Sequence, residues 1–163
     1  MVRSSLVFIA LLMGLPALAQ EPVGCDKFKW PIDQERSLLA KPSSVVSGGD
    51  AAMGAGVTVA LVPFADAKLP MAPSGAPKYP DSYAGFVHIA ALPKAGTYRV
   101  TLAHGAWVDA VQDGHVLKPI AFSGAKGCDG IAKSVKFDLA ATPLVIELSG
   151  TSAHAIAVVV TPD

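Results

Sequence analysis

The sequence predicts a mainly β protein, an antiparallel β-sandwich of jelly-roll type with one short N-terminal helix. Three observations predict this class: several segments alternate apolar and polar residues, glycines and prolines separate these segments at short intervals, and no strand–helix–strand rhythm occurs. Closely spaced short strands are typical of antiparallel sandwiches and jelly rolls. We expect roughly seven to nine strands from this spacing.

The clearest strand is 96–102, "GTYRVTL", in which Tyr98, Val100 and Leu102 share one face and Arg99 lies on the other. The dipeptide Asp113-Gly114 predicts a tight hairpin between two later strands. The other predicted strands span 57–64, 83–92, 107–112, 115–120, 132–140, 143–150 and 153–161.

The segment 28–41, "FKWPIDQERSLLAK", predicts the only helix. Pro31 suits a first helical position, Asp33 and Glu35 suit the first turn, and Pro42 ends the helix. The segment 42–56 is rich in glycine and serine and predicts a flexible loop. A second loop is predicted at 66–82, which carries four prolines that cannot donate to a sheet ladder. Its length makes it a candidate for lining a binding edge.

The chain is predicted to have three parts: a signal peptide at 1–19, an N-terminal helix and flexible loop at 20–56, and the β-sandwich at 57–163. Arg3, an apolar run of about ten residues, and Ala17 and Ala19 around Leu18 form the pattern of a cleaved secretory signal. The run is shorter than the roughly 20 residues that span a bilayer, so we expect no stable membrane insertion after cleavage. We therefore predict a periplasmic or secreted protein.

The two cysteines, Cys25 and Cys128, are predicted to form a disulfide, because an even count in an oxidising compartment favours pairing. Two free buried thiols are the alternative.

The charge of the chain excludes some partners: 13 basic and 13 acidic residues give a net charge of zero. Nucleic-acid binders carry a basic stripe and anionic lipid attracts a polybasic segment, and neither occurs in this sequence.

The four histidines do not form a recognisable metal motif. His88, His104, His115 and His154 are widely spaced, and no His-x-His pair occurs. A metal site made of His88, His104 and a carboxylate stays open as an alternative, because strands can bring distant residues together. His104 and His115 are expected at opposite ends of one strand, too far apart to share a metal. We predict no cofactor, no metal site and no catalytic residue, since no G-x-S-x-G motif or phosphate-binding glycine loop is present.

Four residues are candidates for ligand contacts: Asp109, Trp107, Arg99 and Tyr83. Trp107 is expected to pack between the sheets. Asp109 shares its alternation and would then also face the core, where a carboxylate needs a hydrogen bond or a cation. Arg99 or Lys136 could supply the cation. The alternative is that this face of the strand is only half covered.

Short motifs resemble known secreted proteins. "LPKAGTYRVTL" followed by "AWVDAVQ" is similar to bacterial pre-peptidase C-terminal domains, which are β-sandwiches. Over nearly the whole mature chain, the segments "CDKFKWPIDQERSLL", "SYAG", "WVDAVQDG", "FSGAKGC" and "KSVKFDL" resemble a family of small alphaproteobacterial periplasmic proteins. Some members carry the name of homogentisate 1,2-dioxygenase, an iron enzyme, but this chain lacks the spacing of two histidines and a glutamate that such an enzyme needs.

Three functions follow as hypotheses. The first is a binding or accessory module of the cell envelope, which contacts a glycan, a peptide or another protein through an exposed sandwich face or the proline-rich loop. The second is a structural domain without a small ligand. The third is a metal-dependent enzyme, as the name within the resembling family implies.

Overall fold

The computed structural model describes residues 22–75, 77 and 81–163. The predicted signal peptide, 1–19, lies outside the described residues. The elements in chain order are η1 Cys25–Lys27, α1 Asp33–Leu39, β1 Ser43–Val46, β2 Gly49–Ala51, β3 Val57–Ala60, β4 Val62–Pro63, η2 Phe64–Asp66, β5 Tyr83–Ile89, β6 Gly96–Leu102, β7 Trp107–Gln112, β8 His115–Leu117, β9 Ala121–Gly124, β10 Lys133–Leu139, β11 Leu144–Thr151 and β12 Ala155–Pro162.

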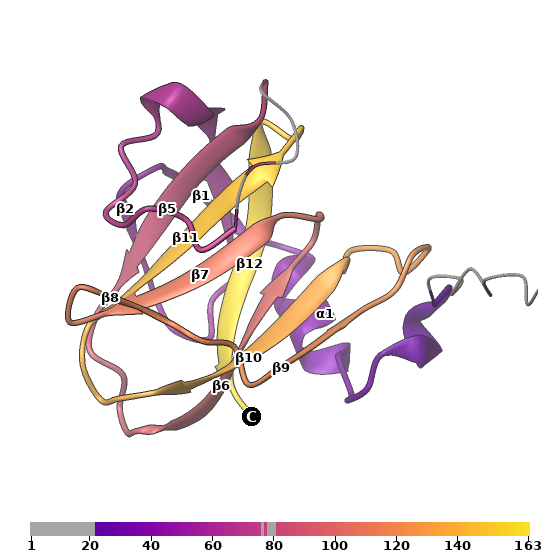
Figure 1. The fold of residues 1–163 in the computed structure, drawn as a ribbon. Coiled ribbons are helices and arrows are strands. Elements are labelled where there is room, and N and C mark those ends of the chain that lie inside the picture. Colours follow the sequence, from indigo (N-terminus) through magenta and orange to yellow (C-terminus); the bar gives the residue numbers. More distant parts are fainter. Residues whose placement is uncertain (1–21, 76, 78–80) are drawn as a thin grey trace, which may run out of the picture.

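The strands form two packed sheets, which confirms the predicted β-sandwich (Figure 1). One sheet has the order β1-β3-β12-β6-β10-β9 and is called the helix-side sheet below. The other has the order β2-β5-β11-β7-β8, with β4 beside β5, and is called the loop-side sheet. Both sheets are mixed, because β1 pairs with β3 and β2 with β5 in parallel, whereas the other described strand pairs are antiparallel.

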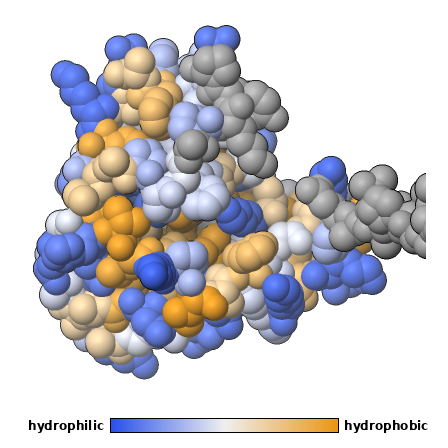
Figure 2. All heavy atoms as spheres, viewed as in Figure 1, coloured by the Kyte–Doolittle hydropathy of each residue, from blue (hydrophilic) through white to orange (hydrophobic). Residues whose placement is uncertain are grey.

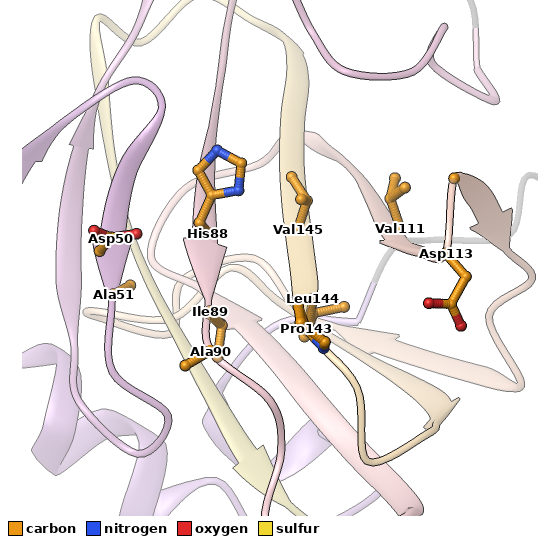
Figure 3. Close-up of a pocket in the computed structure, with 11 residues that line it drawn as sticks. Asp50, Ala51, His88, Ile89, Ala90, Val111, Asp113, Pro143, Leu144 and Val145 are labelled. Atoms are coloured by element: carbon orange, nitrogen blue, oxygen red, sulfur yellow. The ribbon is translucent and has the colours of Figure 1, made fainter.

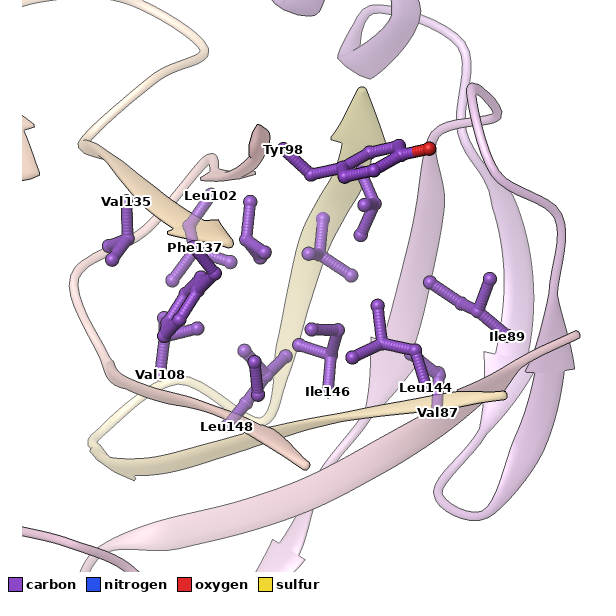
Figure 4. Packing of buried hydrophobic residues seen from close by; sticks show 14 of the residues in the cluster. Val87, Ile89, Tyr98, Leu102, Val108, Val135, Phe137, Leu144, Ile146 and Leu148 are labelled. Carbon is purple, nitrogen blue, oxygen red and sulfur yellow. The ribbon is translucent and has the colours of Figure 1, made fainter. Parts of the chain in front are cut away.

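The core between the sheets follows the alternation in the sequence. Tyr98, Val100 and Leu102 of β6 face inward, as predicted, and pack against Phe137 of β10 and Ile146 of β11 (Figure 4). The buried hydroxyl of Tyr98 donates to the carbonyl of Lys94 at 2.7 Å. A buried phenol needs such a partner, so this contact fixes the ring in place.

The hairpin between β7 and β8 confirms the turn predicted at Asp113-Gly114. Asp113 has φ 51° and Gly114 has φ 75°. Two successive positive φ angles are those of a type I′ turn, whose twist matches the flanking strands. Gln112 therefore pairs directly with His115.

The segment 42–56 is the main difference from the predicted fold. It holds β1 and β2, where the sequence predicts a loop. The chain crosses from the helix-side sheet to the loop-side sheet at Ser47 and Gly48, and Gly48 adopts φ 84°. Strands of three or four residues are too short to display an alternation, so the glycines and serines dominate the sequence signal.

The predicted helix is present but shorter than 28–41. It begins at Asp33, after the N-cap Ile32, and Cys25–Lys27 form a separate short helix. Ile32 and Leu39 pack on the outer surface of the helix-side sheet, against Ile131 and Val159. No helix in the described residues is long and apolar enough to cross a membrane.

Candidate functional site

The outer face of the helix-side sheet is covered by the N-terminal segment. The predicted disulfide between Cys25 and Cys128 is present, with 4.7 Å between the Cα atoms, and it joins residues 103 positions apart. The indole Nε1 of Trp30 donates to Ser134 Oγ at 3.1 Å, beneath the same segment. This face is therefore closed by covalent and polar contacts.

Arg99 belongs to this covered face rather than to a ligand site. Its guanidinium lies 3.2 Å from Glu35 Oε1 and donates to the carbonyl of Pro31 at 2.8 Å. Glu35 is fully buried and also accepts from Thr161 Oγ1 at 2.8 Å. The expectation that Arg99 or Lys136 partners Asp109 was wrong, because both basic residues bind Asp163 on the helix-side sheet.

Asp109 lies on the outer face of the loop-side sheet. Its neighbours Val108 and Ala110 face the core instead. The alternation along the strand was therefore predicted correctly, but the wrong set of alternating residues was expected to face the core. Asp109 is nevertheless only 3% exposed, because the proline-rich loop lies over it. Asp109 Oδ2 accepts the backbone N–H of Ser74 at 3.0 Å, and its Oδ1 accepts the Ser74 hydroxyl.

The position of Trp107 differs from the one expected from the sequence. It does not pack between the sheets: 45% of the residue is exposed, and it stands on the same outer face as Asp109. Its Nε1 donates to Ser74 Oγ at 2.9 Å and to Asp109 Oδ1 at 3.2 Å. The ring lies against Gly75, where an added Cβ would come within 2.6 Å of it. Trp107, Asp109 and the loop therefore form one contact unit.

Glu147 of β11 completes this unit and was not among the candidate residues. It pairs directly across the strands with Asp109 and is 1% exposed. Its Oε1 accepts the backbone N–H of Met71 at 2.7 Å, whereas its Oε2 is buried with no hydrogen-bond partner among the described residues. Burial raises the pKa of Glu147, the Met71 N–H partly opposes this, and the neighbouring Asp109 charge raises it further.

Tyr83, the fourth candidate, does not join Asp109 and Trp107. It begins β5, packs against the core, and its ring lies 4.1 Å from that of His154. His104 precedes β7 and His115 follows it, which places them at opposite ends of that strand, as predicted. Across the described part of the chain, no three histidine, cysteine or acidic side chains gather in a way that could hold a metal ion.

A hollow of about 660 Å³ lies on the same outer face, one row of residues further along the strands (Figure 3). Its wall includes His88 of β5, Val145 of β11 and Val111 of β7, which are cross-strand neighbours. Asp50 pairs with His88 at one end, and Asp113 of the hairpin stands at the other. Sequence reasoning missed this row, because β2 was read as a loop.

Figure 2, viewed from the side of the loop, shows hydrophilic and hydrophobic residues interleaved on this face.

Comparisons of the chain with protein families, with curated proteins and with solved structures found no match.

Proposed function

We propose that this chain is an exported binding module of the cell envelope, and that the hollow formed by Asp50, His88, Val111, Asp113 and Val145 holds its ligand. The observation that carries the proposal is the difference between the two outer faces. The N-terminal segment covers the helix-side sheet, whereas the loop-side sheet carries a hollow that crosses β2, β5, β11 and β7.

The chemistry of the hollow favours a basic ligand. The carboxylates of Asp50 and Asp113 stand at its two ends, and none of the described residues that line it is a lysine or an arginine. Val111 and Val145 supply an apolar floor between them. Carboxylates accept charge-assisted hydrogen bonds from ammonium and guanidinium groups, so a cationic ligand gains most at such ends.

The dimensions of the hollow favour an extended peptide. Four neighbouring strands span three strand spacings, which is roughly 14 Å. About four extended residues cover that distance. We therefore propose a peptide segment with basic side chains about four residues apart, from an envelope protein, as the partner. Among the described residues that line the hollow, His88 is the one aromatic side chain, which leaves little flat aromatic surface for a sugar ring.

The binding test uses amidated Lys-Ala-Ala-Ala-Lys, the matching Glu-Ala-Ala-Ala-Glu peptide and an N-acetylglucosamine oligomer. In NMR titrations, we expect the lysine peptide alone to shift the backbone signals of His88 and Val145, and its affinity to fall as salt rises. Asp50→Asn with Asp113→Asn should weaken binding at least tenfold. Asp138→Asn, an exposed carboxylate on the other sheet, is the matched control.

Three outcomes would contradict this proposal. They are no shift with any probe, equal shifts with the two charged peptides, or binding of the sugar oligomer alone.

Export is the second part of the proposal. The disulfide and the N-terminal sequence support it. Expression of the full chain in a Gram-negative host should yield a periplasmic protein that starts near Gln20 and contains no alkylatable thiol. An intact N-terminus with two free thiols in the cytoplasmic fraction would contradict export.

A further inference from the structure

The segment Leu69–Gly75, called the strap below, crosses the outer face of the loop-side sheet. Figure 1 shows it, in magenta, passing in front of β5 and β11. Pro70 and Pro73 fix two φ angles in the strap and favour extended backbone at the residues before them. The strap is therefore stiff, and it attaches to the sheet as a unit.

Two buried carboxylates hold the strap on the sheet. Glu147 Oε1 accepts the N–H of Met71 at 2.7 Å, and Asp109 Oδ2 accepts the N–H of Ser74 at 3.0 Å. The described donors to these carboxylates, which also include the Ser74 hydroxyl and Trp107 Nε1, are all uncharged. The strap is therefore attached to the sheet through two buried acids.

The two acids oppose each other electrostatically. Asp109 and Glu147 are directly opposite on adjacent strands, where like charges are destabilising. Their burial, at 3% and 1% exposed, reduces the screening by water. Glu147 Oε2 is buried and has no hydrogen-bond partner among the described residues, which favours the neutral acid over the anion.

Among the described residues, no lysine, arginine or histidine forms a hydrogen bond or ion pair with Glu147 or Asp109. On the β5 side, Glu147 faces the uncharged Phe86, and His88 stands one row away, exposed. On the β7 side, the Lys133 ammonium lies 5.5 Å from the centre of the Trp107 ring. In the loop, Lys68 precedes the strap and is exposed.

We propose that the strap is a proton-controlled clamp, closed on the sheet when Glu147 is protonated and loosened when Glu147 is ionised opposite Asp109. Closing the strap removes Glu147 from water and so raises the affinity of this side chain for a proton. Closing is therefore coupled to proton uptake, and acid favours the closed strap. This inference is independent of ligand binding in the hollow, and its test needs no ligand.

The direction of the pH effect follows from the raised pKa of Glu147. With the strap open, the side chain is hydrated and titrates near the ordinary value, 4.5. Between that value and the higher pKa of the closed state, each unit of pH weakens closing by up to about tenfold, because one proton is involved.

Amide hydrogen exchange on the full mature chain tests the clamp. Protection factors, corrected for intrinsic exchange, are measured from about pH 4.5 to pH 8 at Met71 and Ser74, and at Val100 in the core. We expect protection at Met71 and Ser74 to fall several-fold as pH rises, while that of Val100 stays constant. In Glu147→Gln, protection at the strap should be high and independent of pH.

The matched control is Asp138→Asn, which removes an exposed carboxylate from the helix-side sheet and should reproduce the wild-type profile. Asp109→Asn serves as the second variant, in case Glu147→Gln fails to fold; it removes the neighbouring charge that adds to the effect of burial on Glu147, and should weaken the pH dependence. A flat wild-type profile would overturn the proposal, and so would an unchanged pH dependence in the folded Glu147→Gln variant. A parallel loss of protection at Val100 would mean global unfolding, which also overturns it.

Discussion

Each outer face of the sandwich buries one glutamate, and the two glutamates have opposite surroundings. Glu35, on the helix side, is fully buried and meets the Arg99 guanidinium at 3.2 Å. Glu147, on the loop side, is 1% exposed and faces Asp109. A buried carboxylate beside a guanidinium has a partner of opposite charge, whereas a buried carboxylate opposite a second acid has a neighbour of like charge that disfavours its ionisation.

The covalent link adds to this difference. The disulfide ties the N-terminal segment to the loop that follows β9, whereas the contacts described for the strap on its sheet are hydrogen bonds and packing. The covalent bond therefore holds the N-terminal segment permanently on the helix-side sheet. The loop side has a cover held without a described covalent bond and carries a hollow, and the proposed binding function would use this face.

The largest expected effect comes from removing the covalent link. Cys25→Ala with Cys128→Ala should lower the free energy of unfolding by about 4–5 kcal/mol, because the bond closes a loop of roughly 100 residues in the unfolded chain. Urea unfolding of the oxidised protein and the variant measures the change. A loss below about 1 kcal/mol would show that hydrogen bonds and packing alone hold the N-terminal segment.

The second effect comes from breaking the buried ion pair on the helix side. Glu35→Ala leaves the buried Arg99 guanidinium with fewer partners, and should cost about 3 kcal/mol. Asp33→Ala, in the exposed first turn of the same helix, is the control and should cost less than about 1 kcal/mol. Equal losses in the two variants would mean that the Glu35–Arg99 contact contributes nothing beyond the helix itself.

The third prediction compares the effects of removing each of the two tryptophans. Trp107→Ala should cost roughly 1–2 kcal/mol, less than the 3–5 kcal/mol typical of a fully buried aromatic ring, because 45% of the residue is exposed. It should also speed amide exchange at Ser74. Trp30→Ala removes the corresponding half-buried ring from the helix side and should leave exchange at Ser74 unchanged. Faster exchange at Ser74 in both variants would indicate general loosening rather than loss of a strap contact.

The fold was largely predictable from the sequence, because alternation in β6, β10, β11 and β12 reports which side chains are buried. The disulfide was predictable from the cysteine count together with the predicted compartment. The hairpin was predictable because Asp113-Gly114 suits the positive φ angles of its turn. Each of these signals is local, or depends on simple composition.

The candidate site was predicted only in part, because its contacts are long-range. Asp109 was found as an unusual polar residue, but its partner Ser74 lies 35 positions earlier and has no local signal. The sequence also left open which face of β7 points to the core, since both faces of this strand carry apolar residues. Glu147 resembles an ordinary outward-facing acid until the strap is placed over it.

The smallest expected effect has the opposite sign from all the others. Glu147→Gln should stabilise the protein at neutral pH by about 0.5 kcal/mol, because it removes a like charge from the position opposite Asp109 while an amide oxygen can still accept the Met71 N–H. The raised pKa of Glu147 sets the pH dependence. A group whose pKa is higher in the folded state contributes stability that is complete below its unfolded value, near 4.5, and is lost as pH rises through the folded value. The variant should therefore match the wild type near pH 4 and exceed it at pH 7.5. Paired melting curves at the two pH values measure the difference, with Asp138→Asn as the control. Destabilisation by Glu147→Gln at pH 7.5 would show that the ionised carboxylate, rather than the protonated acid, is the form that holds the strap.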